Sequence, residues 1–152
     1  MPNPAVDTPL PVAARKLPGA ESARRARDAD LHTRVFGHPV RCVASLGEWE
    51  YEGPSSVGGL QWYPVPGYGV FADPAERLRT RMAERGYDVG LFREACPQFT
   101  APLGGVTRCL LRAEGVEVAR GEGRSEPEAT AAAVYALVCS PAYTQGAPVL
   151  AR

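Results

Sequence analysis

The spacing of apolar residues predicts a first helix in the early part of the chain. Leu31 and Val35 lie four positions apart, which places both on one face of a helix as its core contacts. Ser22 is a residue type that caps helix N-termini, and Gly37 suits the left-handed conformation at which helices end. We therefore expect a helix that begins after Ser22 and ends at Gly37.

A second amphipathic pattern begins at Asp73. Leu78 and Met82 repeat the spacing of four residues, and the positions beside them are mostly arginines. Asp73 is an expected N-cap, Pro74 fits the first helical position, and Glu76 completes a capping box. The narrow apolar stripe predicts a helix that packs on a sheet.

The pattern then changes to a period of two, which predicts strands over residues 87–95, 106–113 and 116–120. The Glu114-Gly115 pair between the last two runs is typical of a two-residue hairpin loop. On the central strand one parity is more apolar than the other, and we expect it to face the core. Its members are Thr107, Cys109, Leu111 and Ala113.

The stretch "GEGRSEPEATAAAVYALV", residues 121–138, predicts a final helix with a strong start signal. Ser125 and Glu128 have the spacing of a capping box, in which each side chain bonds the other residue's amide. The alanines that follow allow close approach to a sheet. The fold class expected is therefore α+β: an α-β-β-β-α core with a three-stranded antiparallel sheet, preceded by an N-terminal helix and an aromatic loop.

A turn-rich segment rich in aromatic residues follows a short strand predicted over residues 40–46. Its glycines and prolines indicate irregular loop or short hairpin structure. Its large aromatic side chains suit a partner-binding platform, although such residues also close loops over a core. The candidate partner-binding residues are Trp49, Tyr51, Trp62, Tyr63 and Tyr68.

These elements predict one α/β sandwich domain over residues 22–140. Residues 1–21 are proline-rich and are expected to be a disordered arm, and residues 141–152 are expected to form a C-terminal tail.

The charge balance argues against a protein drawn to nucleic acid or membranes by its overall field. The 17 basic residues equal the 17 acidic ones, so any such binding would have to be local. The start of the chain lacks the pattern of a signal peptide, and no apolar run is long enough to span a bilayer. We expect a soluble protein that is not secreted.

No motif for catalysis, for a cofactor or for a metal ion is evident. The spacing of the cysteines contains no CxxC pair, and reduced, mostly buried thiols are expected. His32, His38 and Cys42 form a loose cluster that provides too few ligands for a standard metal site. We therefore expect a chain that is not an enzyme. A small metal site that uses His38 and Cys42 is a weaker alternative.

The element order and the ending "ARGEGRSEPEATAAAVYAL" resemble a double-stranded RNA-binding domain. In that family, lysines in the first turns of the last helix contact phosphates. The matching positions here are Glu126, Pro127 and Thr130, and Glu128 adds another negative charge. Arg124 is the cation left as a nucleic-acid-binding candidate, so the resemblance implies duplex RNA binding only as an alternative function.

A second resemblance covers more of the chain, from about Asp28 to Cys139. "ARDADLHTRVFGHPV", "PVPGYGVFADPAERLRTRM" and the ending quoted above resemble, in that order, small phage proteins of the phage ABA sandwich domain. Two positions depart from the family pattern: Gly69 stands where a serine is usual, and His32 stands where a small residue is usual. The resemblance implies a compact α/β sandwich of phage or prophage origin that acts in the bacterial cytoplasm, and it implies no chemistry. The expected function is therefore that of a non-catalytic accessory protein that binds a host or phage protein partner.

Overall fold

The computed structural model describes residues 19–43, 48–95, 105–141 and 143. Contacts between residues divide the chain into two compact units, Met1–Val65 and Pro66–Arg152. The N-terminal arm and the C-terminal tail expected from the sequence lie largely outside the described residues, and the single domain over residues 22–140 stays a prediction.

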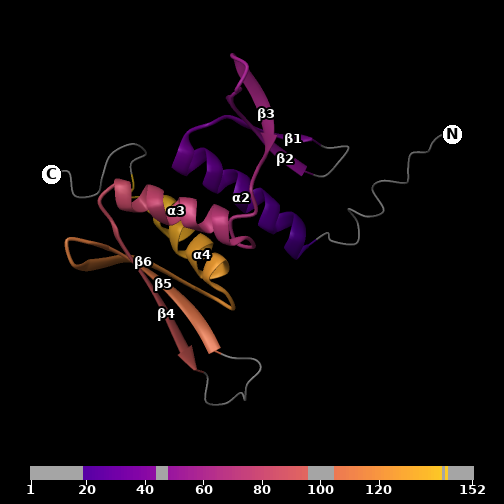
Figure 1. Ribbon diagram of the computed structural model, residues 1–152. Coiled ribbons are helices and arrows are strands. Elements are labelled where there is room, and N and C mark those ends of the chain that lie inside the picture. The colour runs from indigo at the N-terminus through magenta and orange to yellow at the C-terminus, as the bar shows by residue number, and fades with distance from the viewer. Residues whose placement is uncertain (1–18, 44–47, 96–104, 142, 144–152) are drawn as a thin grey trace. The chain divides into compact units, whose positions relative to one another are not determined.

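The first unit contains a helix followed by a small meander of strands (Figure 1). The helix is α2 (Ala20–Phe36), and the strands are β1 (Val40–Val43), β2 (Glu48–Pro54) and β3 (Leu60–Pro64). The strands form an antiparallel sheet in the order β1-β2-β3. The segment expected to be irregular loop or short hairpin is thus a hairpin of β2 and β3.

Helix α2 ends where the sequence predicts, because Gly37 adopts the left-handed conformation with φ of 79° and its amide bonds the Thr33 carbonyl. Leu31 and Val35 are fully buried, as expected. The predicted start was wrong: the helix begins at Ala20 without a side-chain cap, so Ser22 lies inside its first turn.

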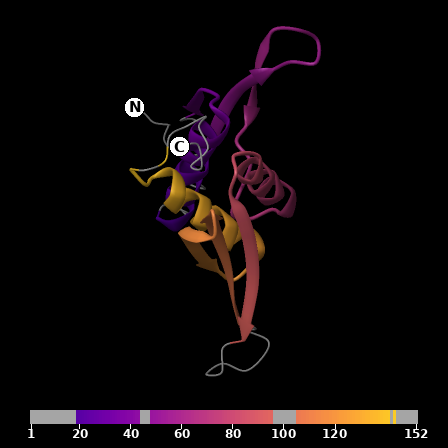
Figure 2. The ribbon, with the colours of Figure 1, turned by 90° about the vertical axis from the view of Figure 1, so that its left-hand side faces the viewer.

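The second unit has the α-β-β-β-α order expected from the sequence. Its elements are α3 (Ala72–Glu84), β4 (Asp88–Ala95), β5 (Gly105–Ala113), β6 (Val116–Gly123) and α4 (Glu126–Val138). The strands form an antiparallel sheet in the order β4-β5-β6 (Figures 1 and 2). The α+β class is confirmed, and the aromatic segment adds a second three-stranded sheet that the prediction did not contain.

The start of α3 differs from the prediction. The Gly67 carbonyl accepts the amides of Val70 and Phe71, and this turn leads directly into a helix that begins at Ala72. Asp73 therefore lies in the first turn and no side chain caps the helix. The acid still lies near the positive end of the helix dipole, where a carboxylate is favourable.

The hairpin of β5 and β6 has the expected loop. Glu114 and Gly115 both have positive φ, 54° and 82°, as the favoured two-residue hairpin turn requires. The parity predicted to face the core is buried, while the alternate positions of β5 are only half-buried. Its members are Thr107, Cys109, Leu111 and Ala113.

The core of the second unit depends on a very close approach of α4 to β6. A Cβ atom added at Gly121 would lie 2.2 Å from the Ala133 nitrogen and 2.6 Å from the Ala129 oxygen. These are backbone atoms, which no rotamer change can move. The helix presents buried alanines at this contact, so backbone meets backbone with little side-chain bulk between.

We predict that Gly121→Ala destabilises the protein by about 2 kcal/mol or more, because the added methyl group overpacks the contact between strand and helix. The matched control is Gly90→Ala in β4, where the new Cβ would meet only the Phe92 ring, at 3.1 Å. Urea unfolding measures both variants. Equal losses of stability in the two would contradict the prediction.

Candidate partner-binding site

The five aromatic residues proposed as a binding platform are not all together. Trp49 and Tyr51 lie on β2, and Trp62 and Tyr63 lie on β3. Tyr68 belongs to the second unit and is 2% exposed, so its side chain is not available on the surface. No periodic signal along the chain distinguishes Tyr68 from the aromatic residues of the hairpin.

The remaining four aromatics are divided between the two faces of the sheet. Tyr51 is paired with Tyr63 across the strands, whereas Trp62 is paired with Glu52. Cross-strand partners share a face and neighbours along a strand alternate, so Trp62 lies opposite to Tyr63. Trp49 is two positions before Tyr51 on β2 and so lies on the same face as Tyr51.

The face that carries Tyr51 packs against α2. The His32 ring lies 4.0 Å from the Tyr51 ring, centroid to centroid, and Tyr51 stacks on Tyr63 at 5.4 Å. Both tyrosine rings lie over Gly53, where a Cβ would be 3.1 Å from Tyr51. The Tyr63 hydroxyl donates a hydrogen bond of 2.6 Å to the Pro54 carbonyl. These tyrosines therefore have a packing role.

Two histidines join the end of α2 to the start of β1. His32 Nε2 and His38 Nδ1 are 2.9 Å apart, and the ring centroids are 5.1 Å apart, so the nitrogens face each other along one line. One of these two nitrogens donates the hydrogen bond and the other accepts it with its lone pair. Neither nitrogen therefore has a lone pair left to bind a metal ion while this bond is made. Within the described ranges no three His, Cys, Asp or Glu side chains gather into a possible metal site.

The opposite face of the sheet is acidic, and we call it the glutamate face. From β2 it carries Glu48, Glu50 and Glu52, which alternate along the strand. Arg41 of β1 donates two hydrogen bonds to Glu50, of 2.8 and 3.0 Å, and its guanidinium lies 4.0 Å above the Trp62 ring. This contact fixes the Trp62 ring beside the carboxylates.

The turn between β2 and β3 presents apolar side chains to solvent, at the end of the hairpin farthest from α2 (Figures 1 and 2). Val57 is 92% exposed and Leu60 is 65% exposed. Hydrogen bonds hold the turn: the Ser55 amide bonds the Gly59 carbonyl, and the Val57 amide bonds the Ser55 hydroxyl. The exposure of Val57 is therefore imposed by a bonded turn.

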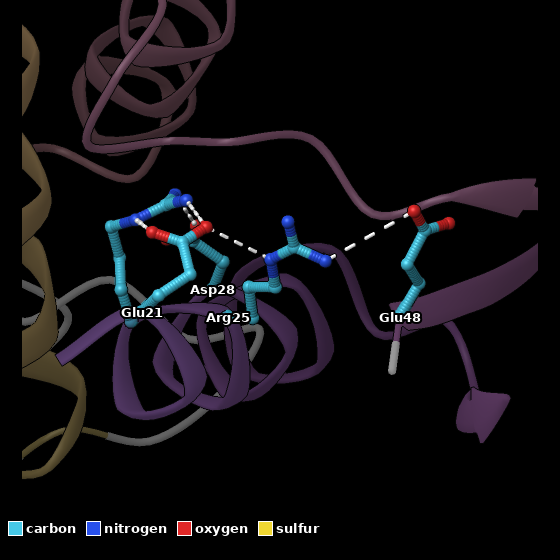
Figure 3. A network of polar contacts seen from close by, with 5 residues as sticks. Glu21, Arg25, Asp28 and Glu48 are labelled. Carbon is cyan, nitrogen blue, oxygen red and sulfur yellow. Dashed lines mark hydrogen bonds and ion pairs between the residues drawn. The ribbon is translucent and has the colours of Figure 1, made fainter. Parts of the chain in front are cut away.

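Near the base of the hairpin, a network of charged side chains follows one side of α2 (Figure 3). Glu21 accepts hydrogen bonds from Arg24 and Arg25, and Arg25 extends to within 4.0 Å of the Glu48 carboxylate. The Arg24 contact holds the pKa of Glu21 below its usual value. This network pairs Arg24 and Arg25 with acidic side chains of the same unit.

Asp28 is a buried member of this network whose hydrogen bonds are incomplete. Its side chain is buried, one oxygen is 3.3 Å from Arg24 Nη1, and the other has no hydrogen-bond partner among the described residues. Burial raises the pKa of Asp28 to about 6. The ionised form is thus less favourable in the folded chain than in the unfolded chain.

In the second unit, the start of α4 satisfies its own backbone groups. The Glu128 amide donates to Ser125 Oγ at 3.2 Å, as the capping box predicts. The return bond differs from the prediction, because Glu128 Oε1 accepts the Arg124 amide at 2.9 Å and not that of Ser125. Both bonds occupy groups that an anion would otherwise bind.

The cysteines are less buried than expected. Cys109 is buried, and burial raises the pKa of its thiol. Cys42 and Cys139 are exposed, which corrects the expectation of mostly buried thiols, and Cys96 lies outside the described residues. All three described thiols are free.

We predict that Asp28→Asn stabilises the protein at pH 7 to 8 by about 1–3 kcal/mol. The folded chain binds a proton at Asp28 more tightly than the unfolded chain does, so its contribution to stability is present below about pH 4 and is lost as pH rises through about 6. Urea unfolding across this pH range measures the change. The matched control is Asp30→Asn, whose wild-type carboxylate pairs with Arg34 on the same helix. A wild-type pH profile in Asp28→Asn would contradict the prediction.

Comparisons of the chain with protein-family models, with curated proteins and with solved structures find no match. In the part of the chain that the structure describes, no helix is both long and apolar enough to cross a membrane.

Proposed function

We propose that the chain is a non-catalytic accessory protein that binds a protein partner through the hairpin of β2 and β3. The observation that carries this proposal is the exposure of Val57 and Leu60 at the bonded turn. Apolar side chains held in water at a fixed position offer contact area to a partner at little cost in conformational entropy. The glutamate face and Trp62 continue this surface toward the base of the hairpin.

The proposed origin of the protein is a phage or prophage genome, and the proposed location is the cytoplasm of the bacterial host. Both rest on the resemblance of the helix starts and glycines to the phage ABA sandwich domain. The α+β fold is compatible with that resemblance, and the assignment concerns origin without adding any chemistry.

We predict that Val57→Ser combined with Leu60→Ser abolishes partner binding without affecting folding, because both wild-type side chains are exposed. Affinity purification from host lysate with wild-type and variant protein measures the difference. The matched control is Val116→Ser combined with Phe92→Ser, which removes exposed apolar groups from the second unit. Identical sets of captured proteins from wild type and the hairpin variant would contradict the proposal.

A second candidate function is duplex RNA binding by the second unit. The α-β-β-β-α order, with an antiparallel sheet, favours it. The charge at the start of α4 opposes it, because Glu126 and Glu128 lie in the first turn and Glu128 accepts the Arg124 amide. A phosphate would meet carboxylates where positive charge is needed. Partner binding by the hairpin is therefore the function we favour.

We predict no retention of duplex RNA by the protein in a filter-binding experiment at low salt. The alternative function predicts retention that falls steeply with salt and is lost in Arg124→Glu, with Arg112→Glu on β5 as the matched control. Retention with that pattern would replace partner binding by RNA binding as the main function.

A further inference from the structure

The glutamate face provides more specific information about the partner than the apolar turn does. The face carries the three carboxylates of Glu48, Glu50 and Glu52. Two guanidiniums meet them, because Arg41 of β1 bonds Glu50 and Arg25 of α2 lies 4.0 Å from Glu48, so the charge of the whole group is still negative. Arg41 is already committed to Glu50, at 2.8 Å. The Glu52 carboxylate makes no ion pair within the described ranges.

The carboxylates also have a regular spacing. They stand at alternate positions of one strand, so neighbouring glutamates are separated by two residues, about 6.6–6.8 Å along β2. An extended polypeptide with basic residues at every second position has the same repeat and directs those side chains to one side. A helical segment has a different repeat and would match the row at fewer positions.

Trp62 adds a contact that charge alone would not provide. Its ring lies on the same face as Glu52, its cross-strand partner, and is held by the Arg41 guanidinium at 4.0 Å. A large amphipathic ring beside carboxylates suits the aliphatic stem of an arginine or lysine, whose charged end then lies on the acids. Leu60 continues the face toward the turn.

We propose that the glutamate face binds an extended, basic segment of a partner protein, in which arginine or lysine alternates with other residues. This inference rests on the proposed function and names the chemistry of the partner. Electrostatic complementarity of this kind fixes orientation and raises the association rate more than it raises affinity. The same carboxylates would repel the phosphates of a nucleic acid, so a polypeptide is the occupant that the face selects.

The test uses the full chain with Trp49→Phe, which leaves Trp62 as the sole tryptophan because the sequence has 2. The probe is a short synthetic peptide in which arginine alternates with threonine. We expect a saturable change in Trp62 fluorescence that weakens as salt is added. A peptide with the same composition in block order should bind more weakly, and one with glutamate in place of arginine should not bind.

Glu48→Gln combined with Glu52→Gln should weaken binding of the alternating peptide by roughly three- to tenfold, because each exposed ion pair contributes little by itself. This pair of changes leaves the contact of Arg41 with Glu50 and Trp62 intact and removes the exposed 4.0 Å contact of Glu48 with Arg25. The matched control, Glu84→Gln with Glu122→Gln in the second unit, makes the same change in net charge and should bind as wild type.

The outcomes of these experiments distinguish failure of this inference from failure of the function on which it rests. A partner lost by the Val57 and Leu60 variant, yet retained by the Glu48 and Glu52 variant at wild-type affinity, overturns the inference and leaves the proposed function standing. Absence of any peptide-induced fluorescence change at low salt, or equal binding of the alternating and block peptides, also overturns it.

Discussion

The contact of α4 with β6 is the constraint on which the second unit depends. At Gly121 the backbone of the helix occupies the space that any side chain would need, 2.2 Å from the Ala133 nitrogen. Such an approach requires glycine on the strand and small residues on the helix together. It places Val134 and Leu137 in the core, where they supply the larger apolar contacts. The alanine-rich composition of α4 thus reflects a geometric requirement of the fold.

The same constraint limits what the start of α4 can do. A helix N-terminus that follows a glycine-rich strand is often an anion site, because its amides lack partners within the helix. Here Ser125 accepts the Glu128 amide, and Glu128 accepts the Arg124 amide. The end that could have bound phosphate is closed by its own side chains and is negatively charged. Its role is to fix where the helix begins against the sheet.

Local signals in the sequence predicted most of this fold, and signals that depend on tertiary context did not. The turn at Glu114 and the cap at Ser125 depend on residues next to each other in the chain, so both were predicted correctly. The start of α3 was set by a turn at Gly67, which the apparent capping box at Asp73 concealed. Tyr68 resembled its aromatic neighbours in type, yet its burial in the second unit follows from packing that composition does not encode.

The hairpin of β2 and β3 shows how alternation along a strand decides which side chains each face presents. The aromatic residues have the largest side chains of this segment, but the period of two places Tyr51 against α2 and Trp62 on the other face. The same alternation collects the acids of "EWEYE" on the face of Trp62, an arrangement visible in the sequence once that segment is known to be a strand. Tyr51 and Tyr63 therefore take part in packing, while the glutamates of β2 stand at alternate positions on the opposite face. A partner that recognises the hairpin must then satisfy the carboxylates as well as cover the apolar turn, because burying them unpaired would cost more than the apolar contact returns.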